Sequence, residues 1–274
     1  MPCYHPLPAW RNAGGVVSLR EPRERRGDEE FLRLPCGSCL GCRMSRAREW
    51  ALRCSLESAF HDETCWVTLT YDDQHKPPTL SKDHLSKWVK RLRARLGDRR
   101  LRFFASGEYG EQTYRPHYHA ILFGMSGGKD IQEAWPFGFT RTDPLTPAAI
   151  AYVAGYAAKK IGWKLESGER LDYDTGEVYE YQPPFVLMSR RPGIADQARK
   201  YWQSWRKHAV YHGREVPVPR FLHQAYLAKA TDEQVEQLKQ ERKAIIRDLT
   251  RERLDAAEAI AQAKQKLQSQ RRKL

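Results

Sequence analysis

Residues 101–124 read LRFFASGEYGEQTYRPHYHAILFG, and this stretch decides the fold of the middle of the chain. Its two ends are apolar and aromatic, as strands are, and the polar run EYGEQTYR connects them. The pattern therefore predicts an antiparallel hairpin. Because successive side chains of a strand alternate in direction, His117 and His119 project from the same face. Glu108 ends the first strand, and pairing of the two strands brings its carboxylate within reach of both imidazoles.

The segments around this hairpin predict an α+β fold, in which helices flank a central antiparallel sheet. CWVTLTYDD predicts an interior strand over residues 65–71. Apolar residues at helical spacing predict basic helices over residues 44–60 and 82–96, and Ser81 is the expected cap of the second. The Ala-rich run PAAIAYVAGYAAKKIG predicts a further helix that begins at Pro147.

The two ends of the chain have different patterns. The first 35 residues are rich in Pro, Gly and Arg and predict loops or an extended arm, while residues 165–185 fit either a small hairpin or an insertion loop. From Thr231 onward, apolar residues spaced by threes, fours and sevens predict a long charged helix that packs or forms a coiled coil. We therefore expect an N-terminal arm with a Cys cluster, a main domain and a charged C-terminal helix, over residues 1–43, 44–225 and 226–274.

The composition favours a polyanionic partner. Forty-seven basic and 34 acidic residues give a net charge of +13 and a pI near 9.5, which points to nucleic acid first and to a membrane surface second. No apolar run approaches the ~20 residues that span a bilayer, and the N-terminus lacks the layout of a signal peptide, so we expect a cytoplasmic chain without a membrane partner. The residues expected to contact DNA are Arg43, Arg46, Lys87, Lys90, Arg91, Arg115, Arg190 and Arg191.

His117, His119 and Glu108 form a candidate metal site. Two imidazole nitrogens and one carboxylate leave coordination positions for water and a phosphate oxygen, and this mixed set suits Mg²⁺ or Mn²⁺, with Zn²⁺ as an alternative. The His pair also fits a simpler interpretation, in which both rings only satisfy hydrogen bonds on a solvated strand face. The strand alone leaves both interpretations open.

The helix from Pro147 brings a second group of reactive side chains together. Tyr152, Tyr156 and Lys160 are spaced four residues apart and share one helix face, with Lys159 beside them. A phenol has a pKa of about 10, so it attacks a phosphodiester only where a polarised phosphate and nearby positive charge assist it. We expect both tyrosines to act as nucleophiles, with both lysines supporting the phosphate. The alternative is that the tyrosines pack on the sheet and the lysines extend to solvent.

The cysteines of PCGSCLGC are a separate candidate site. Cys36, Cys39 and Cys42 are too close together to form a disulfide framework, and three thiolates at this spacing suit a structural Zn²⁺. Cys3, Cys54 and His5 are the candidates for a fourth ligand. The alternative is a thiol-rich turn that caps the Arg-rich helix.

Four segments carry a resemblance to a known family. CWVTLTYDD, FFASGEYG, RPHYHAILFG and YVAGYAAKK, in this order, closely resemble the replication initiator proteins of microviruses, specifically the gokushovirus-like group, in the HUH endonuclease superfamily. PCGSCLGCRMSRAREWALR and SRRPGI are similar to that group as well, so that the resemblance covers residues 30–200. It implies a compact ferredoxin-like sheet with His117 and His119 as metal ligands and Glu108 as the third. It also implies Tyr152 and Tyr156 as nucleophiles and Lys160 as a phosphate-binding residue.

The resemblance implies a function as well. A rolling-circle replication initiator nicks and rejoins DNA at the viral origin through a 5′-phosphotyrosine, in the host cytoplasm, acting on single-stranded and origin DNA with the host replication machinery. Two other functions remain open. One is a transposase or relaxase with the same HUH core, and the other is a non-catalytic, basic DNA-binding protein with a zinc knuckle. The C-terminal helix has no catalytic counterpart in the family, and we expect it to serve self-association.

Overall fold

The computed structural model describes residues 3–22, 29–110, 112–159, 168–171, 176–244 and 250–271. The chain forms two compact units. The larger unit is Arg46–Ile245, and the smaller unit combines Met1–Ser45 with Ile246–Leu274.

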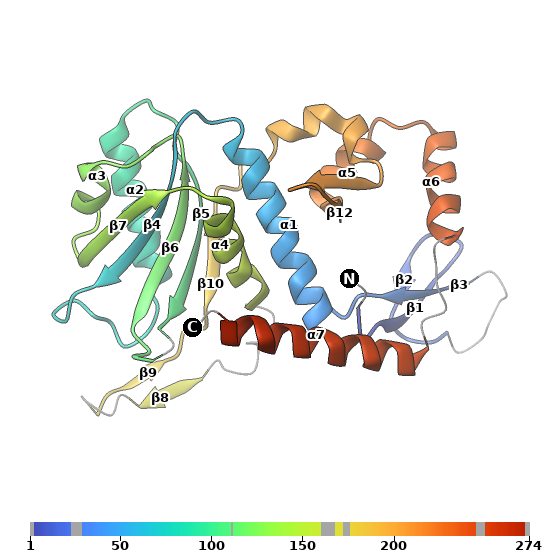
Figure 1. Ribbon diagram of the computed structural model, residues 1–274, viewed down its shortest axis with the longest axis horizontal. Coiled ribbons are helices and arrows are strands. Elements are labelled where there is room, and N and C mark those ends of the chain that lie inside the picture. The colour runs from blue at the N-terminus through green and yellow to red at the C-terminus, as the bar shows by residue number, and fades with distance from the viewer. Residues whose placement is uncertain are drawn as a thin grey trace. The chain divides into compact units, whose positions relative to one another are not determined.

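A five-stranded antiparallel sheet is the centre of the larger unit (Figure 1). Its strand order is β10 (Phe185–Met188), β5 (Arg102–Tyr109), β6 (Pro116–Phe123), β4 (Thr64–Tyr71) and β7 (Gly138–Pro144). The predicted hairpin, formed by β5 and β6, and the predicted interior strand β4 are confirmed. The edge strands β7 and β10 were not predicted. The sequence of β7, GFTRTDP, contains Gly, Asp and Pro, which are typical of turns, and it is extended because it pairs with β4 along its whole length.

Helices cover both faces of this sheet (Figure 1). Helices α2 (Lys82–Leu96) and α3 (Lys129–Glu133) pack on one face, where Leu69, Trp88 and Tyr118 are buried. On the other face, α4 (Pro147–Lys159) and the part of α1 (Leu40–Ser58) that belongs to this unit enclose Phe104, Ile121 and Val153. The α+β fold predicted from the sequence is therefore confirmed. Alternation along β6 sends residue 118 into the first core and residues 117, 119 and 121 to the second face.

The predicted helix over residues 82–96 is confirmed as α2. Ser81 caps it, since its Oγ accepts a hydrogen bond from the His84 amide at 3.1 Å, and Gly97 follows it with φ of 58°. Leu85 and Trp88 are fully buried on the sheet side. Burial of one such side chain contributes about 1.5–3 kcal/mol, so the apolar face fixes α2 on the sheet more strongly than its cap does.

The larger unit continues with smaller elements. The segment whose structure was left open contains a hairpin of β8 (Glu169–Leu171) and β9 (Val178–Glu180). After β10 come a 3₁₀ helix η2 (Gln197–Trp205), a second hairpin of β11 (His208–Tyr211) and β12 (Arg214–Pro217), and the helices α5 (Arg220–Leu227) and α6 (Asp232–Ala244). Leu52, Trp205, Leu222 and Leu238 form a common core for these elements.

The smaller unit corrects the prediction of loops or an extended arm at the N-terminus. Strands β1 (Leu7–Arg11), β2 (Val17–Ser18) and β3 (Glu30–Leu34) form an antiparallel sheet in the order β2-β1-β3. Residues 7–11 pair with residues 30–34, and the rings of Trp10 and Phe31 meet edge to face with centroids 5.7 Å apart. This long-range pairing, absent from the local pattern, forms the strands.

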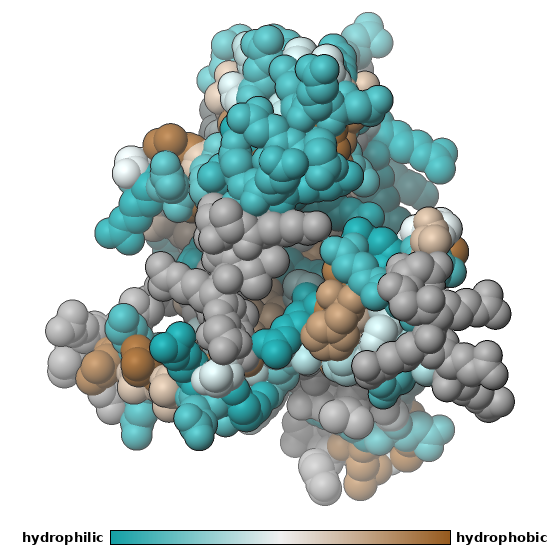
Figure 2. Space-filling view, turned by 90° about the vertical axis from the view of Figure 1, so that its right-hand side faces the viewer, coloured by the Kyte–Doolittle hydropathy of each residue, from teal (hydrophilic) through white to brown (hydrophobic). Residues whose placement is uncertain are grey.

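The C-terminal region contains α6 and a separate helix, α7 (Arg251–Arg271), in place of one continuous helix from Thr231. A break precedes α7, because Thr250 Oγ1 accepts a hydrogen bond from the Arg253 amide at 3.4 Å and so caps a new helix. Residues 245–249 lie outside the described residues. No described helix is long and apolar enough to cross a membrane. The coloured part of the face in Figure 2 is mostly hydrophilic, with small separate hydrophobic areas.

Candidate metal and tyrosine site

Strand pairing brings the predicted metal ligands together. Glu108 of β5 lies directly opposite His117 of β6, and its Oε1 atom is 3.1 Å from His117 Nε2 and 2.8 Å from His119 Nε2. The ligand atoms of all three residues lie within 4.8 Å of one another. Glu108 and His119 are buried, so an ionised carboxylate here needs compensation from close partners.

The other nitrogen of each imidazole has a partner of its own. His119 Nδ1 lies 3.0 Å from Thr68 Oγ1 on β4, and His117 Nδ1 lies 3.2 Å from the backbone carbonyl of Arg115. Since a carbonyl only accepts, Nδ1 of His117 carries a proton, and in a neutral ring the Nε2 lone pair would face the carboxylate. A lone pair next to a carboxylate is favourable only with a proton or a metal cation between His117 Nε2 and Glu108 Oε1. A hydrogen bond that fixes Nδ1 in this way is typical of histidines that bind metals through Nε2.

Helix α4 places both tyrosines at the same carboxylate. The Tyr152 hydroxyl lies 3.5 Å from Glu108 Oε1, and the Tyr156 hydroxyl hydrogen-bonds to Glu108 and to Tyr152. The His119 ring stacks on Tyr156 with centroids 6.1 Å apart and meets Tyr152 edge to face at 5.2 Å. Tyr152 is 43% exposed and Tyr156 only 8%, so the two phenols differ in access to a large substrate.

The site holds Glu108 charged and Tyr156 neutral. Burial alone would raise the pKa of Glu108, but hydrogen bonds from His117, His119 and Tyr156 outweigh it and lower the pKa to about 2. For Tyr156, burial and then the hydrogen bonds to Glu108 and Tyr152 raise the pKa well above its usual value. The carboxylate is therefore ionised near neutral pH while the phenol keeps its proton.

The two predicted lysines are placed incompletely. Lys159 is the last residue of α4, but its side chain lies outside the part of the chain that is described. Lys160 lies outside the described residues altogether. Their roles beside the tyrosines stay a prediction.

Two site residues were missed in the sequence. Thr68 holds His119, and Trp66 lies next to it on the same face of β4, with its ring centroid 5.8 Å from that of His119 and 6.0 Å from that of Tyr152. The alternation of TCWVTLTY puts residues 66 and 68 on one face, but only the register of β4 against β6 shows that this is the face of His119.

The part of the chain that contains this site matches a known protein family. Residues 64–161 match the family described as replication-associated protein ORF2/G2P, and this range runs from β4 past the end of α4. The chain is similar to phage replication-associated proteins. The resemblance to microvirus replication proteins is thereby confirmed.

Three such relatives can be named. The chain is 28% identical to the replication-associated protein VP4 of Bdellovibrio phage phiMH2K, over 82% of this chain and 77% of the relative. It is 29% identical to the replication-associated protein ORF2 of Spiroplasma virus 4, over 69% and 64% of the two chains. With the replication-associated protein ORF4 of Chlamydia phage 1, identity is 32% over 50% and 41%. The match thus spans less than two thirds of two of these relatives, and no solved structure matched.

The basic residues expected to contact DNA lie on several elements, and their contact with DNA stays a prediction. Lys87 and Lys90 are exposed on α2, which covers the sheet face opposite to His117 and His119. Arg91 donates to the Ala134 carbonyl at 2.7 Å, and Arg115 pairs with Asp73, so both have structural contacts. Arg43 and Arg46 lie on α1 in different units. Arg190 and Arg191 are exposed just after β10.

The cysteine cluster is the second site. Cys3 joins Cys36, Cys39 and Cys42, and the four sulfur atoms lie within 4.8 Å of one another. His5 instead lies 2.8 Å from Glu258, and Cys54 is fully buried in the core of the larger unit. All six cysteines are free thiols. The amides of Cys36 and Cys39 donate to the sulfurs of Cys3 and Cys36 at 3.2 and 3.3 Å, which is how thiolates in metal sites are commonly stabilised.

Proposed function

We propose that this chain is a metal-dependent DNA endonuclease and strand transferase that initiates rolling-circle replication through a 5′-phosphotyrosine. The observation that carries the proposal is the surroundings of one oxygen atom, Glu108 Oε1. Two imidazole nitrogens and the Tyr152 hydroxyl lie within 3.5 Å of it, and Tyr156 hydrogen-bonds to the same carboxylate. A solvated strand face with two incidental histidines does not explain why two phenols converge on the same buried carboxylate.

The donor set fits a divalent cation. His117 Nε2, His119 Nε2 and a Glu108 oxygen would hold it, and the Nδ1 contacts to Thr68 and Arg115 keep both rings turned toward Glu108. Mixed nitrogen and oxygen ligands suit Mn²⁺ or Mg²⁺. Such a cation, when bound, polarises the phosphate and stabilises negative charge that develops on its oxygens.

The reaction that we propose conserves the phosphodiester bond energy. The Tyr152 oxygen forms a bond to phosphorus while the bond from phosphorus to the 3′ oxygen breaks. The phenol releases its proton to solvent, and the departing 3′ oxygen takes one up, which leaves a free 3′-hydroxyl and a 5′-phosphotyrosine. The reverse step rejoins the strands without ATP. Tyr156, on the same helix face, then attacks a second phosphate while Tyr152 is occupied.

The relatives support a role in replication, since all three are named as replication-associated proteins of phages. We therefore propose single-stranded and origin DNA as substrates, the host replication machinery as a partner and the host cytoplasm as the place of action. A transposase or relaxase would use the same chemistry on other DNA. A non-catalytic DNA-binding protein would bind DNA without a covalent product.

The test is incubation of the full chain with single-stranded DNA of the replicon that encodes it, in Mn²⁺ or Mg²⁺, followed by denaturing electrophoresis. We expect a covalent adduct and a free 3′-hydroxyl, both lost with EDTA and with His119→Ala. Tight binding with no adduct across the whole replicon would favour the non-catalytic alternative.

We further propose that Cys3, Cys36, Cys39 and Cys42 hold a structural Zn²⁺. In a tetrahedral site with zinc–sulfur bonds of about 2.3 Å, the sulfurs are about 3.8 Å apart. The sulfurs of Cys39 and Cys3 lie 3.8 Å apart. Amide hydrogen bonds from Cys39 and Ser38 outweigh burial and lower the pKa of Cys36 to about 6, so its thiolate is available near neutral pH.

A further inference from the structure

A group of arginines lies at the end of strand β5 opposite to Glu108. A pocket of about 700 Å³ opens where β5 begins and β10 ends. Arg102 in its wall is six residues before Glu108, which at about 3.3 Å per residue places it about 20 Å away along the strand. The pocket is therefore separate from the metal and tyrosine site. Arginine dominates its lining, which includes Arg93, Arg99, Arg100, Arg102, Arg190 and Arg191.

The charge of this lining is largely uncompensated. Of the six arginines, Arg102 pairs with Glu57 and Arg99 pairs with Glu63. No Asp or Glu lines the pocket. Arg100, Arg190 and Arg191 are exposed, and no carboxylate in the described part of the chain lies within ion-pair distance of them. The six arginines of the lining are thus balanced by only two carboxylates, those of Glu57 and Glu63, so the pocket favours an anionic ligand.

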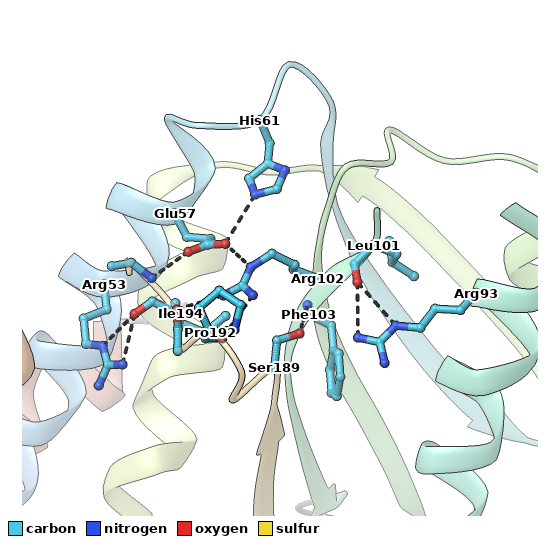
Figure 3. A network of polar contacts seen from close by, with 12 residues as sticks. Arg53, Glu57, His61, Arg93, Leu101, Arg102, Phe103, Ser189, Pro192 and Ile194 are labelled. Atoms are coloured by element: carbon cyan, nitrogen blue, oxygen red, sulfur yellow. Dashed lines mark hydrogen bonds and ion pairs between the residues drawn. The ribbon is translucent and has the colours of Figure 1, made fainter. Parts of the chain in front are cut away.

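A buried ion pair holds the segment that carries Arg190 and Arg191. Figure 3 shows the buried ion pair of Arg102 and Glu57, in which Arg102 also donates to the carbonyls of Pro192 and Gly193 at 3.0 and 2.8 Å. The second carboxylate oxygen of Glu57 accepts the Ala195 amide at 2.6 Å. A buried pair that contacts three backbone groups of one segment serves to hold that segment.

Two more contacts complete the support. Ser189 and Phe103 exchange hydrogen bonds, from the Ser189 amide to the Phe103 carbonyl at 3.0 Å and from the Phe103 amide to Ser189 Oγ at 3.1 Å. Arg53 donates twice to the Ile194 carbonyl, at 3.2 and 3.0 Å (Figure 3). The backbone is thus held on both sides of the two exposed arginines, so that little backbone order remains to be gained on binding.

We propose that the pocket and the segment from Ser189 to Ile194 bind backbone phosphates of single-stranded DNA, as a holding site apart from the site of cleavage. DNA as the anion rests on the function proposed above. Guanidinium groups suit this ligand, because their planar donors match phosphate oxygens in pairs. A DNA strand that binds here, about 20 Å from Glu108, keeps one segment of the DNA bound while another segment is cut.

The test measures binding without cleavage. The full chain carrying Tyr152→Phe and Tyr156→Phe, without added Mg²⁺ or Mn²⁺, is titrated with a short labelled single-stranded oligodeoxynucleotide at several salt concentrations. Arg190→Ala with Arg191→Ala should weaken binding about tenfold at low salt and reduce the slope of log K against log salt by about 1.4, since each phosphate contact on a single strand contributes about 0.7. Arg214→Ala with Lys229→Ala removes two exposed charges outside the pocket and is the matched control.

An unchanged slope in the Arg190 and Arg191 variant, or an equal loss in the control, would overturn this inference. Thermal unfolding of both variants shows whether the fold is retained. Because this experiment needs neither metal nor nucleophile, its result is independent of the proposed chemistry. If the Arg190 and Arg191 variant shows the expected loss of binding but the wild-type chain forms no covalent adduct, the proposed nuclease is overturned and the phosphate site is supported.

Discussion

Glu108 is the residue around which the candidate site is built. Its contacts to His117 and His119 could be predicted, because hairpin pairing and strand alternation are local properties of residues 101–124. The contact of Thr68 with His119 could not be predicted, because Thr68 lies 51 residues before His119 and the contact depends on the register of β4 against β6. The sequence thus predicted that Glu108 meets both histidines, and only the structure shows that Thr68 contacts one of them.

Replacing Thr68 tests this orienting contact. Thr68→Val keeps the shape of the side chain but removes the hydroxyl next to His119 Nδ1. We expect about a 10–100-fold loss in Mn²⁺ affinity, measured by electron paramagnetic resonance, because outer partners of ligating histidines have effects of this size. Thr142→Val, at an exposed position of β7, is the control and should leave the affinity unchanged. Equal affinities for both variants would mean that Thr68 has no part in metal binding.

The two tyrosines should have unequal roles. Tyr152 is the more exposed phenol, whereas burial raises the pKa of Tyr156. Tyr152→Phe is therefore expected to remove most of the first cleavage, and Tyr156→Phe to leave that cleavage but impair joining to a second strand. The measurement is a two-oligonucleotide assay that separates cleaved from joined products. Normal first cleavage by Tyr152→Phe would assign the first attack to Tyr156.

At the scale of elements, prediction succeeded where the local pattern was strong. The hairpin of β5 and β6 and the amphipathic helix α2 follow from periodicity and caps. The N-terminal sheet did not, because it depends on the pairing of β1 with β3, which are distant in the sequence. Strand β7 likewise depends on its partner β4 and not on its own residues.

Glu57 connects helix α1 to β5 and to the segment after β10. Glu57→Gln leaves Arg102 as a buried charge without its counter-charge, and the loss of one partner of a buried pair costs about 3–5 kcal/mol. We expect a clearly lower free energy of unfolding in urea. Asp62→Asn, at an exposed position next to the end of α1, should change it by less than about 0.5 kcal/mol. Similar stability of the two variants would contradict the role assigned to the Arg102–Glu57 pair.

At the scale of the whole molecule, the two ends of the chain belong to one compact unit. Leu40 and Tyr4 form a small core with Ala257 and Ala261 of α7, and His5 contacts Glu258, 253 residues later in the chain. No local pattern reveals such contacts. One face of α7 is therefore covered within the chain, and self-association through its exposed residues stays a prediction, as do the expected domain boundaries.

The Cys cluster joins residue 3 to residues 36–42 within this unit, and the Zn²⁺ that we propose for it is expected to stabilise the unit. We predict one zinc per chain by elemental analysis of protein purified without chelator, and loss of that zinc in Cys3→Ser. Cys65→Ala, a buried cysteine of the sheet core, is the matched control and should keep the metal. Zinc-free protein with unchanged thermal stability would contradict a structural role for the cluster.

The most direct test of the central claim is mass spectrometry of the chain after reaction with single-stranded replicon DNA in Mn²⁺. The proposed mechanism predicts a nucleotide joined through its 5′-phosphate to the peptide that contains Tyr152 or Tyr156, and no such peptide from Glu108→Gln or His119→Ala protein. Cleaved DNA with a free 5′-phosphate and unmodified tyrosines would contradict it, because the phosphodiester would then have been hydrolysed by water.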